Sequence, residues 1–406
     1  LLLNSAKNAN PISEISKKGK FHKKQHLITI GNDKCIIYSK RGQEYHMQEI
    51  VKNILKEKLF KNNYSVIHPE TLKKLGKITP ERMLNLIFSA ISQKFGLFLS
   101  ELYPFELYLE VVRGCNFKCI MCDGWKFPKY FLSYEDVKKI LPHFRKSTYL
   151  ESYGVGEPFL NKDIYKIVKY ASEELKLVAS VTSNFSVIDP KKALEMGANQ
   201  ISASIDSLNK EKFFMLRHGN IDIVKKNLIT LVKLKGNRKY PIVAIKTVVS
   251  KLNFHELEDI FQFGISIGIR KFYIQTLFDG NLISKPNDLT TEEILKINEL
   301  TRKYKKQARF ILSSYRGDIK GFKPAGYCFM TFYSAIIDFR GDVYPCCKVM
   351  EDKSASFGNI FYEPQKVLKN RNLFLKKFRS SPPEFCKKCE LYFRNFKEKK
   401  NLQIKQ

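Results

Sequence analysis

Three closely spaced cysteines are the residues of this chain whose type and spacing point most directly to chemistry. Cys115, Cys119 and Cys122 follow the pattern C-x3-C-x2-C. This spacing can place three thiolates around one iron–sulfur cube. A fully ligated [4Fe–4S] cluster takes four cysteines, so three neighbouring ligands would leave one iron open for another molecule. Taken alone, the same cysteines could also belong to a partial zinc site.

The segment before these cysteines has the composition of a strand. Residues 106–112 read Glu-Leu-Tyr-Leu-Glu-Val-Val, which is rich in β-branched and aromatic side chains. Arg113 and Gly114 then lead directly into Cys115. We therefore expect the cysteine loop at the C-terminal end of a first strand.

Beyond Gly114 the pattern alternates between strands and helices as far as about residue 308. Five further strands are predicted over 149–153, 177–182, 200–205, 242–249 and 271–275. Amphipathic helices are predicted over 134–144, 163–175, 221–234, 254–267 and 292–307. Six such units favour an α/β fold in which parallel strands are covered by helices.

The cysteine motif and the six βα units together resemble the radical S-adenosylmethionine (radical SAM) superfamily. The resemblance implies a partial (β/α)6 barrel, similar to a TIM barrel left open, with its chemistry at the C-terminal ends of the strands. It also implies that the amino and carboxylate groups of S-adenosylmethionine chelate the open iron. Cys115, Cys119 and Cys122 would then hold the catalytic [4Fe–4S] cluster.

A glycine-rich turn after the second strand belongs to the same resemblance. Gly154, Gly156, Glu157 and Pro158 stand in Gly-Val-Gly-Glu-Pro, which looks like the family's G-x-G-E-P motif. Glycine lets backbone approach a ligand closely. The resemblance implies that this backbone and Glu157 hold the methionine amino group. A plain turn is the alternative.

Polar residues end the next two strands in a similar way. Thr182 and Asn184 resemble the family's T-N-G motif, although Phe185 replaces the glycine. Ser204 and Asp206 resemble its S-x-D pattern. The resemblance implies that these residues bind the cosubstrate. Ordinary capping is the alternative for each.

Two single residues complete the cofactor site that the resemblance implies. Arg217, in Leu-Arg-His-Gly, stands where relatives place an arginine that pairs with the cosubstrate carboxylate. Met121 stands where relatives often have an aromatic residue near the adenine. Methionine can pack softly against a ring, so this departure weakens the assignment only slightly.

Period-two alternation predicts which side chains line the barrel interior. The inward set is Ser180, Thr182, Ser202, Ser204, Ala244, Lys246, Val248, Tyr273 and Gln275. The opposite set, expected under the helices, is Ala203, Ile205, Ile245, Phe272 and Ile274. Such an interior suits a polar substrate. Lys246 is a candidate catalytic residue, since a charge inside an apolar strand is costly unless paired; a register shift of one residue would place it on the surface.

A second group of cysteines follows in the last hundred residues. In order, its features are Cys328, a predicted hairpin over 335–345, Cys346 and Cys347, Gly-Asn-Ile at 358–360, and Cys386-Lys-Lys-Cys389. This order resembles the C-terminal SPASM extension of radical SAM enzymes, whose full pattern has more cysteines and two auxiliary clusters. The resemblance implies one auxiliary [4Fe–4S] cluster here, with ligands Cys328, Cys346, Cys386 and Cys389. A structural zinc ion is the alternative.

The adjacent cysteines of this group are expected to have different roles. Neighbouring side chains of an extended segment point to opposite faces. Cys346 is the predicted ligand because it occupies the proline-cysteine position of the resembled motif. Cys347 is then either a buried small hydrophobe or a catalytic hydrogen donor, and a donor would make the reaction an epimerisation.

Composition limits the remaining possibilities. Nine cysteines, of which only Cys35 lies outside the two groups, indicate metal binding in a reducing compartment. No apolar run approaches the roughly 20 residues that a membrane span needs, so we expect a cytoplasmic protein. The net charge of +31 fits either anionic partners or a lysine-rich solvated surface. No clear nucleic-acid motif accompanies it.

Three regions are predicted. Residues 1–104 form an appended α+β domain of unknown role, residues 105–310 the barrel, and residues 311–406 a small iron–sulfur domain. The first region has predicted strands near 27–30 and 35–38 and helices near 47–59 and 81–95. A module that binds a peptide leader is one interpretation of it.

The resemblance implies a radical SAM enzyme that reductively cleaves S-adenosylmethionine to a 5′-deoxyadenosyl radical and abstracts hydrogen from a polar substrate. The auxiliary cluster favours net oxidation of a sugar, cyclitol or other small polar metabolite. The alternatives are maturation of a ribosomally made peptide and radical epimerisation. The electron would come from a flavodoxin- or ferredoxin-type donor. A basic, zinc-stabilised binding protein is the non-enzymatic alternative.

Overall fold

The computed structural model describes residues 28–31, 34–38, 44–46, 78–95, 98, 100–277, 287–313, 328–378 and 380–387. Within the chain two compact units are distinguished, Leu1–Leu102 and Tyr103–Gln406. The predicted helix over 47–59 and the predicted ligand Cys389 lie outside the described residues. The three-region division stays a prediction.

The first unit contains a small antiparallel sheet and one helix. Its sheet has the order β1 (Ile28–Gly31), β2 (Lys34–Tyr38) and β3 (Glu44–His46). Helix α4 (Pro80–Phe95) begins with a proline, which is well tolerated in the first turn because no backbone donor is lost there. The helix predicted over 81–95 is therefore confirmed.

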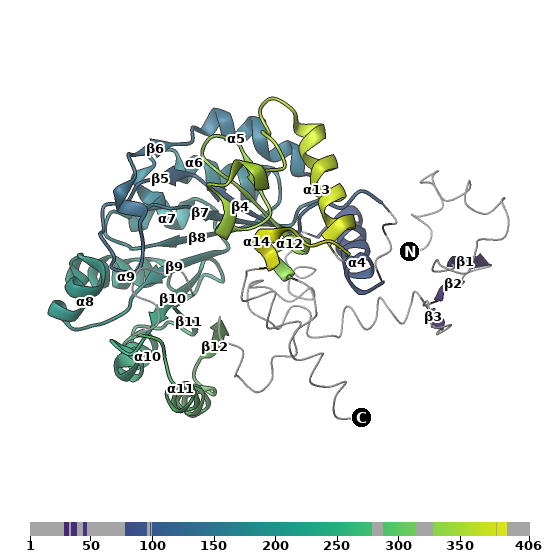
Figure 1. Cartoon of the computed structure of the whole chain (residues 1–406). Coiled ribbons are helices and arrows are strands. Elements are labelled where there is room, and N and C mark those ends of the chain that lie inside the picture. The colour runs from purple at the N-terminus through teal and green to yellow at the C-terminus, as the bar shows by residue number, and fades with distance from the viewer. Residues whose placement is uncertain are drawn as a thin grey trace. The chain divides into compact units, whose positions relative to one another are not determined.

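The second unit is built on one large sheet (Figure 1). The six predicted strands are present as β4 (Glu106–Glu110), β7 (Tyr149–Tyr153), β8 (Val178–Ser183), β9 (Gln200–Ser204), β10 (Ile242–Val249) and β11 (Lys271–Thr276). They pair in parallel in chain order. This is the α/β arrangement that the alternating pattern predicts, a TIM-like sheet left open.

Strands that were not predicted to join the barrel extend the sheet at both edges. β12 (Arg309–Ser313) pairs in parallel with β11. At the other edge β13 (Ser334–Ile337) pairs in parallel with β4 and antiparallel with β14 (Val343–Tyr344). The predicted C-terminal hairpin is therefore continuous with the barrel sheet.

Helices cover the outer face of the sheet, as Figure 1 shows. They are α5 (Tyr134–Ile140), α6 (Ile164–Lys169), α7 (Pro190–Glu195), α8 (Lys210–Arg217), α9 (Ile221–Lys235), α10 (Leu257–Ser266) and α11 (Thr291–Tyr304). The short helices α7 and α8 were not predicted. Each begins after a capping side chain, Asp189 for α7 and Asn209 for α8, that accepts backbone N–H bonds of the first turn.

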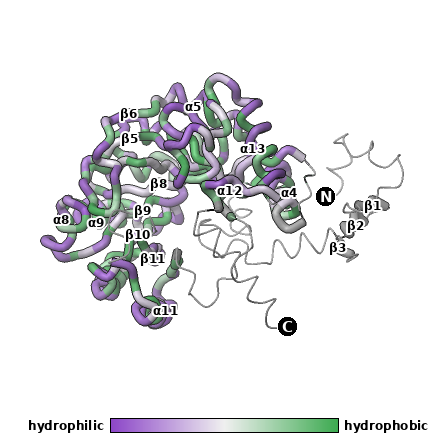
Figure 2. Tube along the Cα trace, viewed as in Figure 1, coloured by the Kyte–Doolittle hydropathy of each residue, from purple (hydrophilic) through white to green (hydrophobic). Residues whose placement is uncertain are grey.

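The two faces of the sheet differ as the alternation predicts. The five residues expected under the helices all belong to the main hydrophobic core. Phe272 packs against Phe261 of α10, with ring centroids 5.2 Å apart. Gly264 allows this close approach, because a Cβ there would lie 2.6 Å from the Phe272 ring. Figure 2 shows hydrophobic and hydrophilic residues interleaved along the outer helices, as expected when one side of a helix packs on a sheet.

The C-terminal part of the second unit packs around a buried arginine. Its helices are α12 (Phe329–Tyr333), α13 (Pro364–Phe378) and α14 (Glu384–Lys387). Arg371 of α13 is fully buried and donates to the Phe332 carbonyl oxygen at 2.7 Å. Burial lowers the pKa of Arg371 to about 9.

Candidate active site

The cysteine loop and the glycine-rich turn touch each other through backbone. β5 (Val112–Arg113) leads into Gly114, whose N–H donates to the Val155 carbonyl oxygen at 2.9 Å. A Cβ on Gly156 would lie 2.5 Å from the Gly114 carbonyl oxygen, and one on Gly154 would lie 2.6 Å from that of Val112. Both glycines are therefore required by the close packing of the two loops.

The three cysteines differ in their exposure to solvent. Cys115 and Cys119 are half-buried and Cys122 is exposed. Backbone N–H groups of Phe117 and Gly124 donate to the sulfurs of Cys115 and Cys122, each at 3.4 Å. Such donors stabilise thiolates.

The donor set of this loop is three cysteine thiols, the ligands that iron–sulfur clusters take. Burial raises the pKa of Cys119 to about 12, an effect that Arg217 opposes. Ligation by this residue must therefore displace a proton.

Glu157 joins the turn after β7 to the turn after β8. It is 2% exposed. Its carboxylate accepts from the Phe159 N–H at 3.1 Å, the Ser183 hydroxyl at 2.7 Å and the Asn184 N–H at 2.7 Å. Burial raises its pKa to about 7. Pro158 follows in the first turn of a short 3-10 helix. Glu157 thus holds the loops in register, and its contact with a cosubstrate stays a prediction.

The turn after β8 lies against the cysteine loop. The Asn184 side-chain amide donates to Asn116 Oδ1 at 2.9 Å and lies 3.9 Å from Cys115 Sγ. Phe185 has φ +62°, in the left-handed region that glycine adopts at no steric cost. Its N–H donates to Ser183 Oγ and its ring is fully buried. The sequence departs from T-N-G here while the backbone keeps the conformation that a glycine would take.

Arg217 is placed beside the second cysteine by the end of α8. Its Nε donates to Asp206 Oδ2 at 2.6 Å, and its Nη1 lies 3.9 Å from Cys119 Sγ. Burial would lower the pKa of Arg217, but Asp206 and Cys119 together raise it above its ordinary value. A Cβ on Gly219 would lie 2.3 Å from the ring of Phe117 in the cysteine loop. The Leu-Arg-His-Gly run thus packs directly on this loop.

The barrel interior holds an ion pair between distant strands. Lys246 Nζ lies 3.3 Å from Glu151 Oε1 and 2.5 Å from Thr182 Oγ1. Burial would raise the pKa of Glu151, but Lys246 lowers it below its ordinary value. The ammonium also lies 5.4 Å from the Tyr273 ring centroid. Ser204 is the Cα partner of Lys246 on the neighbouring strand. Two predicted interior residues, Thr182 and Lys246, therefore contact each other, and both contact Glu151. Glu151 was not predicted from the sequence.

Deeper in the interior, further polar side chains face one another. Gln200 accepts from Lys271 at 2.7 Å and from Tyr273 at 3.1 Å. Glu106 is fully buried and accepts from the Tyr108 hydroxyl at 3.2 Å. Burial raises its pKa to about 8. Period-two alternation could have identified these residues, because each shares the inward parity of its strand.

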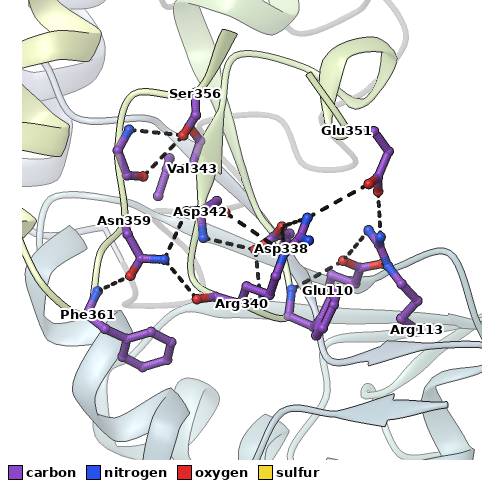
Figure 3. A network of polar contacts seen from close by, with 12 residues as sticks. Glu110, Arg113, Asp338, Arg340, Asp342, Val343, Glu351, Ser356, Asn359 and Phe361 are labelled. Carbon is purple, nitrogen blue, oxygen red and sulfur yellow. Dashed lines mark hydrogen bonds and ion pairs between the residues drawn. The ribbon is translucent and has the colours of Figure 1, made fainter. Parts of the chain in front are cut away.

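A polar network connects the C-terminal hairpin to the cysteine loop and the glycine-rich turn (Figure 3). Glu110 at the end of β4 accepts two bonds from Arg113, each 3.0 Å, one from Val155 N–H at 3.3 Å and one from Phe339 N–H at 3.2 Å. Arg113 also contacts Glu351 at 2.5 Å. One buried carboxylate therefore connects the cysteine loop, the glycine-rich turn and the hairpin.

The described cysteines of the second group, Cys328, Cys346, Cys347 and Cys386, lie close enough at the base of this hairpin to interact electrostatically. Burial, together with the nearby thiols of Cys347, Cys328 and Cys386, raises the pKa of Cys346. Cys386 is buried, Cys328 and Cys346 are half-buried, and Cys347 is exposed. The interpretation of Cys347 as a buried small hydrophobe is therefore wrong, because its side chain faces solvent.

The comparison with known families agrees with these features. Residues 109–264 match the radical SAM superfamily, and residues 328–390 match the iron–sulfur cluster-binding domain named SPASM. The chain therefore contains a radical SAM domain followed by a C-terminal SPASM domain. The first domain implies a catalytic [4Fe–4S] cluster and S-adenosylmethionine, and the second implies auxiliary iron–sulfur chemistry.

Curated relatives share the core of the chain. A tungsten-containing aldehyde ferredoxin oxidoreductase cofactor-modifying protein of Pyrococcus furiosus is 25% identical over 199 residues, covering 46% of this chain and 53% of the relative. A GTP 3′,8-cyclase of Campylobacter lari is 26% identical over 212 residues, covering 49% and 63%. The chain thus spans between half and two thirds of the length of these relatives.

Solved structures share the fold. SuiB of Streptococcus suis bound to S-adenosylmethionine has a TM-score of 0.58 at 17% identity, covering 91% of this chain and 93% of SuiB. anSMEcpe with bound AdoMet has a TM-score of 0.54 at 17% identity, covering 73% and 95%. No helix among the described residues is both long and apolar enough to cross a membrane.

Proposed function

We propose that this enzyme abstracts a hydrogen atom from an uncharged polar group held in the barrel interior. The observation that carries this proposal is the Lys246–Glu151 pair. Two of the three N–H donors of the ammonium are used by Glu151 and Thr182, and the side chain is 30% exposed. The remaining donor suits a carbonyl or hydroxyl oxygen. A carboxylate would be repelled by the ionised Glu151, whereas a neutral acceptor would not.

The predicted cofactor residues lie at or after the C-terminal ends of the strands that line the same interior. Cys115, Cys119 and Cys122 would hold the catalytic cluster. When bound, that cluster and S-adenosylmethionine supply one-electron cleavage of the sulfonium to methionine and a hydrogen-abstracting 5′-deoxyadenosyl group. Arg217, oriented by Asp206, would bind the methionine carboxylate.

The remaining contacts to the cosubstrate would come from strand ends. Backbone of the turn from Gly154 to Pro158 would accept the methionine amino group, and Glu157 would keep that turn in place. Asn184 and Ser204 would contact the rest of the cosubstrate, each from the C-terminal end of its strand. Thr182 would orient Lys246 below them.

The C-terminal cysteines would hold one auxiliary cluster through Cys328, Cys346, Cys386 and Cys389. A cluster with four thiolates can accept an electron from a substrate radical, which favours net oxidation. Radical epimerisation is the second candidate, because the exposed Cys347 thiol could return a hydrogen atom instead.

Two substrate classes meet the requirement for a neutral polar acceptor. Sugar or cyclitol alcohols present hydroxyl groups, and a peptide presents amide carbonyls. Small-molecule chemistry is supported by the curated relatives named as GTP cyclases. A peptide is supported by SuiB, which has been solved with its precursor peptide SuiA and shares the fold over 90% of this chain.

Transfer of deuterium tests the proposal and separates these classes. Extract from cells grown in heavy water would be divided by size into peptides and small metabolites, and each fraction incubated anaerobically with the reconstituted enzyme. Deuterium in 5′-deoxyadenosine, measured by mass spectrometry, identifies the fraction that holds the substrate. Lys246→Met should lower this transfer while Lys246→Arg retains part of it. Deuterium transfer that is unchanged in Lys246→Met would contradict the assignment.

The catalytic cluster needs one electron per turnover. We propose that a flavodoxin- or ferredoxin-type protein supplies it in the reducing cytoplasm, where free thiols and iron–sulfur clusters persist.

A further inference from the structure

A basic and aromatic surface is formed by Lys118 of the cysteine loop and by residues that directly follow the third cysteine. Its exposed members are Lys118, Trp125, Lys126, Lys129, Tyr130 and Phe131, and we call it the cluster-side surface. The aromatic residues Trp125, Tyr130 and Phe131 are 38%, 47% and 50% exposed. Large aromatic side chains are usually buried, so three exposed together are typical of an interaction surface.

This surface is held in place from below. β6 (Tyr130–Phe131) pairs antiparallel with β5, which leads into the cysteine loop. Tyr130 stacks on Phe339 of the C-terminal hairpin, with ring centroids 4.8 Å apart. The Arg113 guanidinium lies 4.7 Å from the same Phe339 ring. The cluster-side surface is therefore preformed, and a partner would lose little conformational entropy in ordering it.

The charge of the surface has one sign. Lys118 and Lys126 place their ammonium groups 5.8 and 5.6 Å from the Trp125 ring. Asp123 is the one acidic residue between 116 and 131, and it is paired with Lys126 at 2.6 Å. The surface fits a partner whose contact face is acidic.

The surface lies close to a predicted ligand of the catalytic cluster, which indicates the function of its partner. Trp125 is three residues from Cys122, an exposed residue whose sulfur accepts from the Gly124 N–H. A protein seated on this surface would stand beside an iron that Cys122 ligates. No comparable route to the cysteine loop is offered by the buried Glu110–Arg113 side.

We propose that the cluster-side surface docks an acidic one-electron carrier protein for the catalytic cluster. This inference rests on the proposed function. In the transfer, the hydroquinone flavin of a flavodoxin is oxidised to the semiquinone, and the catalytic cluster is reduced from the 2+ to the 1+ state. One electron leaves the donor and one reaches the cluster, with no other reactant.

Binding of oxidised flavodoxin tests the docking without any turnover. Affinity for the reconstituted full chain would be measured by calorimetry at low and high salt. The double variant Lys126→Glu/Lys129→Glu should weaken binding at least roughly tenfold and flatten the salt dependence, because opposite-charge pairs become like-charge pairs. Lys305→Glu/Lys306→Glu, exposed residues after α11, makes the same change in net charge elsewhere and should leave affinity within about twofold.

Reduction kinetics then separate docking from catalysis. Reduced flavodoxin should bleach the catalytic cluster at least roughly tenfold more slowly in Lys126→Glu/Lys129→Glu. Dithionite is a small reductant, so its rate and the S-adenosylmethionine cleavage that it drives should not change. Equal flavodoxin affinity and reduction rate in the wild type and this variant would overturn the proposed surface. Loss of dithionite-driven cleavage from wild-type protein would instead overturn the proposed function.

Discussion

Arg217 and Asp206 form a buried ion pair beside the cysteine loop. The guanidinium is held at one edge by Asp206 Oδ2, and its Nη1 lies beside Cys119. Asp206 is itself fixed, because its other oxygen accepts from the Val248 N–H at 2.8 Å. The arginine is thus oriented before any ligand arrives, which reduces the entropy that binding must lose.

Removing this arginine should weaken cosubstrate binding. Loss of one partner of a buried charged contact typically costs about 2–5 kcal/mol, so Arg217→Ala should lower S-adenosylmethionine affinity at least roughly tenfold in calorimetry while iron content is retained. Arg217→Lys keeps the positive charge but loses the planar guanidinium. Its S-adenosylmethionine affinity should lie between those of the wild type and Arg217→Ala. Equal affinity in Arg217→Ala would show that the residue only braces α8 against the loop.

Glu106 gives the fold a pH dependence of its own. Its Oε1 has no hydrogen-bond partner among the described residues, and burial raises its pKa to about 8. Between the ordinary carboxyl pKa and about 8, the folded state therefore binds a proton that the unfolded state does not. The free energy of unfolding should fall as pH rises through this window.

The variant Glu106→Gln should remove that contribution. Urea denaturation of the wild type and the variant at pH 5.5 and pH 8 would measure the difference. We expect the wild type to lose more stability than the variant between these pH values, since glutamine has no proton to release. Parallel pH profiles would mean that Glu106 ionises in the fold as it does in the unfolded chain.

At the scale of elements, Glu110 joins three segments that are far apart in the sequence. It ties β4 to Val155 after β7 and to Phe339 of the C-terminal hairpin. It also accepts from Arg113 of β5, as Figure 3 shows. A carboxylate that serves three loops at once fixes their relative positions. The network therefore connects the hairpin of the SPASM domain to the cysteine loop and to the glycine-rich turn.

Truncating Glu110 should be strongly destabilising. Glu110→Ala leaves the Arg113 guanidinium, 4% exposed, without its buried partner, and breaking such a pair costs about 3–5 kcal/mol. Glu351→Gln is the matched control, because Glu351 contacts the same arginine but is 58% exposed and should change stability by less than about 1 kcal/mol. Comparable losses in the two variants, measured by denaturant unfolding, would contradict the central role of Glu110.

Sequence patterns predicted the six central strands and their inward residues because alternation and turn signals are local. They did not predict that β12 and β13 extend the sheet, since strand pairing across distant segments leaves no mark on the spacing of either segment. Glu151 illustrates the same limit at a residue. Alternation along residues 149–153 predicts that its side chain points into the interior. Its pairing with Lys246, however, depends on which strands face one another across the interior.

At the scale of the whole molecule, the chain places its two groups of cysteines at opposite ends of a shared sheet, because β13 runs parallel to β4 and β14 runs antiparallel to β13. The catalytic group follows β4 and β5, and the auxiliary group follows β14, which reaches β4 through β13. The two groups are therefore parts of one continuous structure. Each should nevertheless bind iron without the other, because no cysteine belongs to both loops.

Changing Cys115, Cys119 and Cys122 to alanine tests this independence. The triple variant should lose about four irons per chain and all formation of 5′-deoxyadenosine, while the auxiliary iron remains. Iron analysis and Mössbauer spectroscopy would measure the loss, and the auxiliary signal serves as the internal control. Continued cleavage of S-adenosylmethionine by the triple variant would contradict the assignment of the catalytic cluster.

The adjacent cysteines Cys346 and Cys347 decide how the reaction ends. Cys346 is half-buried and lies near the thiols of Cys328 and Cys386, whereas Cys347 is exposed, so we expect Cys346 to be the ligand of a shared cluster. Cys346→Ala should therefore lose the auxiliary iron, and Cys347→Ala should keep both clusters.

If Cys347→Ala also keeps full turnover, the thiol is not a hydrogen donor and the reaction is an oxidation. If it keeps S-adenosylmethionine cleavage but loses product, the thiol returns a hydrogen atom and the reaction is an epimerisation. Loss of iron in the Cys347 variant alone would reverse the ligand assignment, because the exposed sulfur would then be the one that binds.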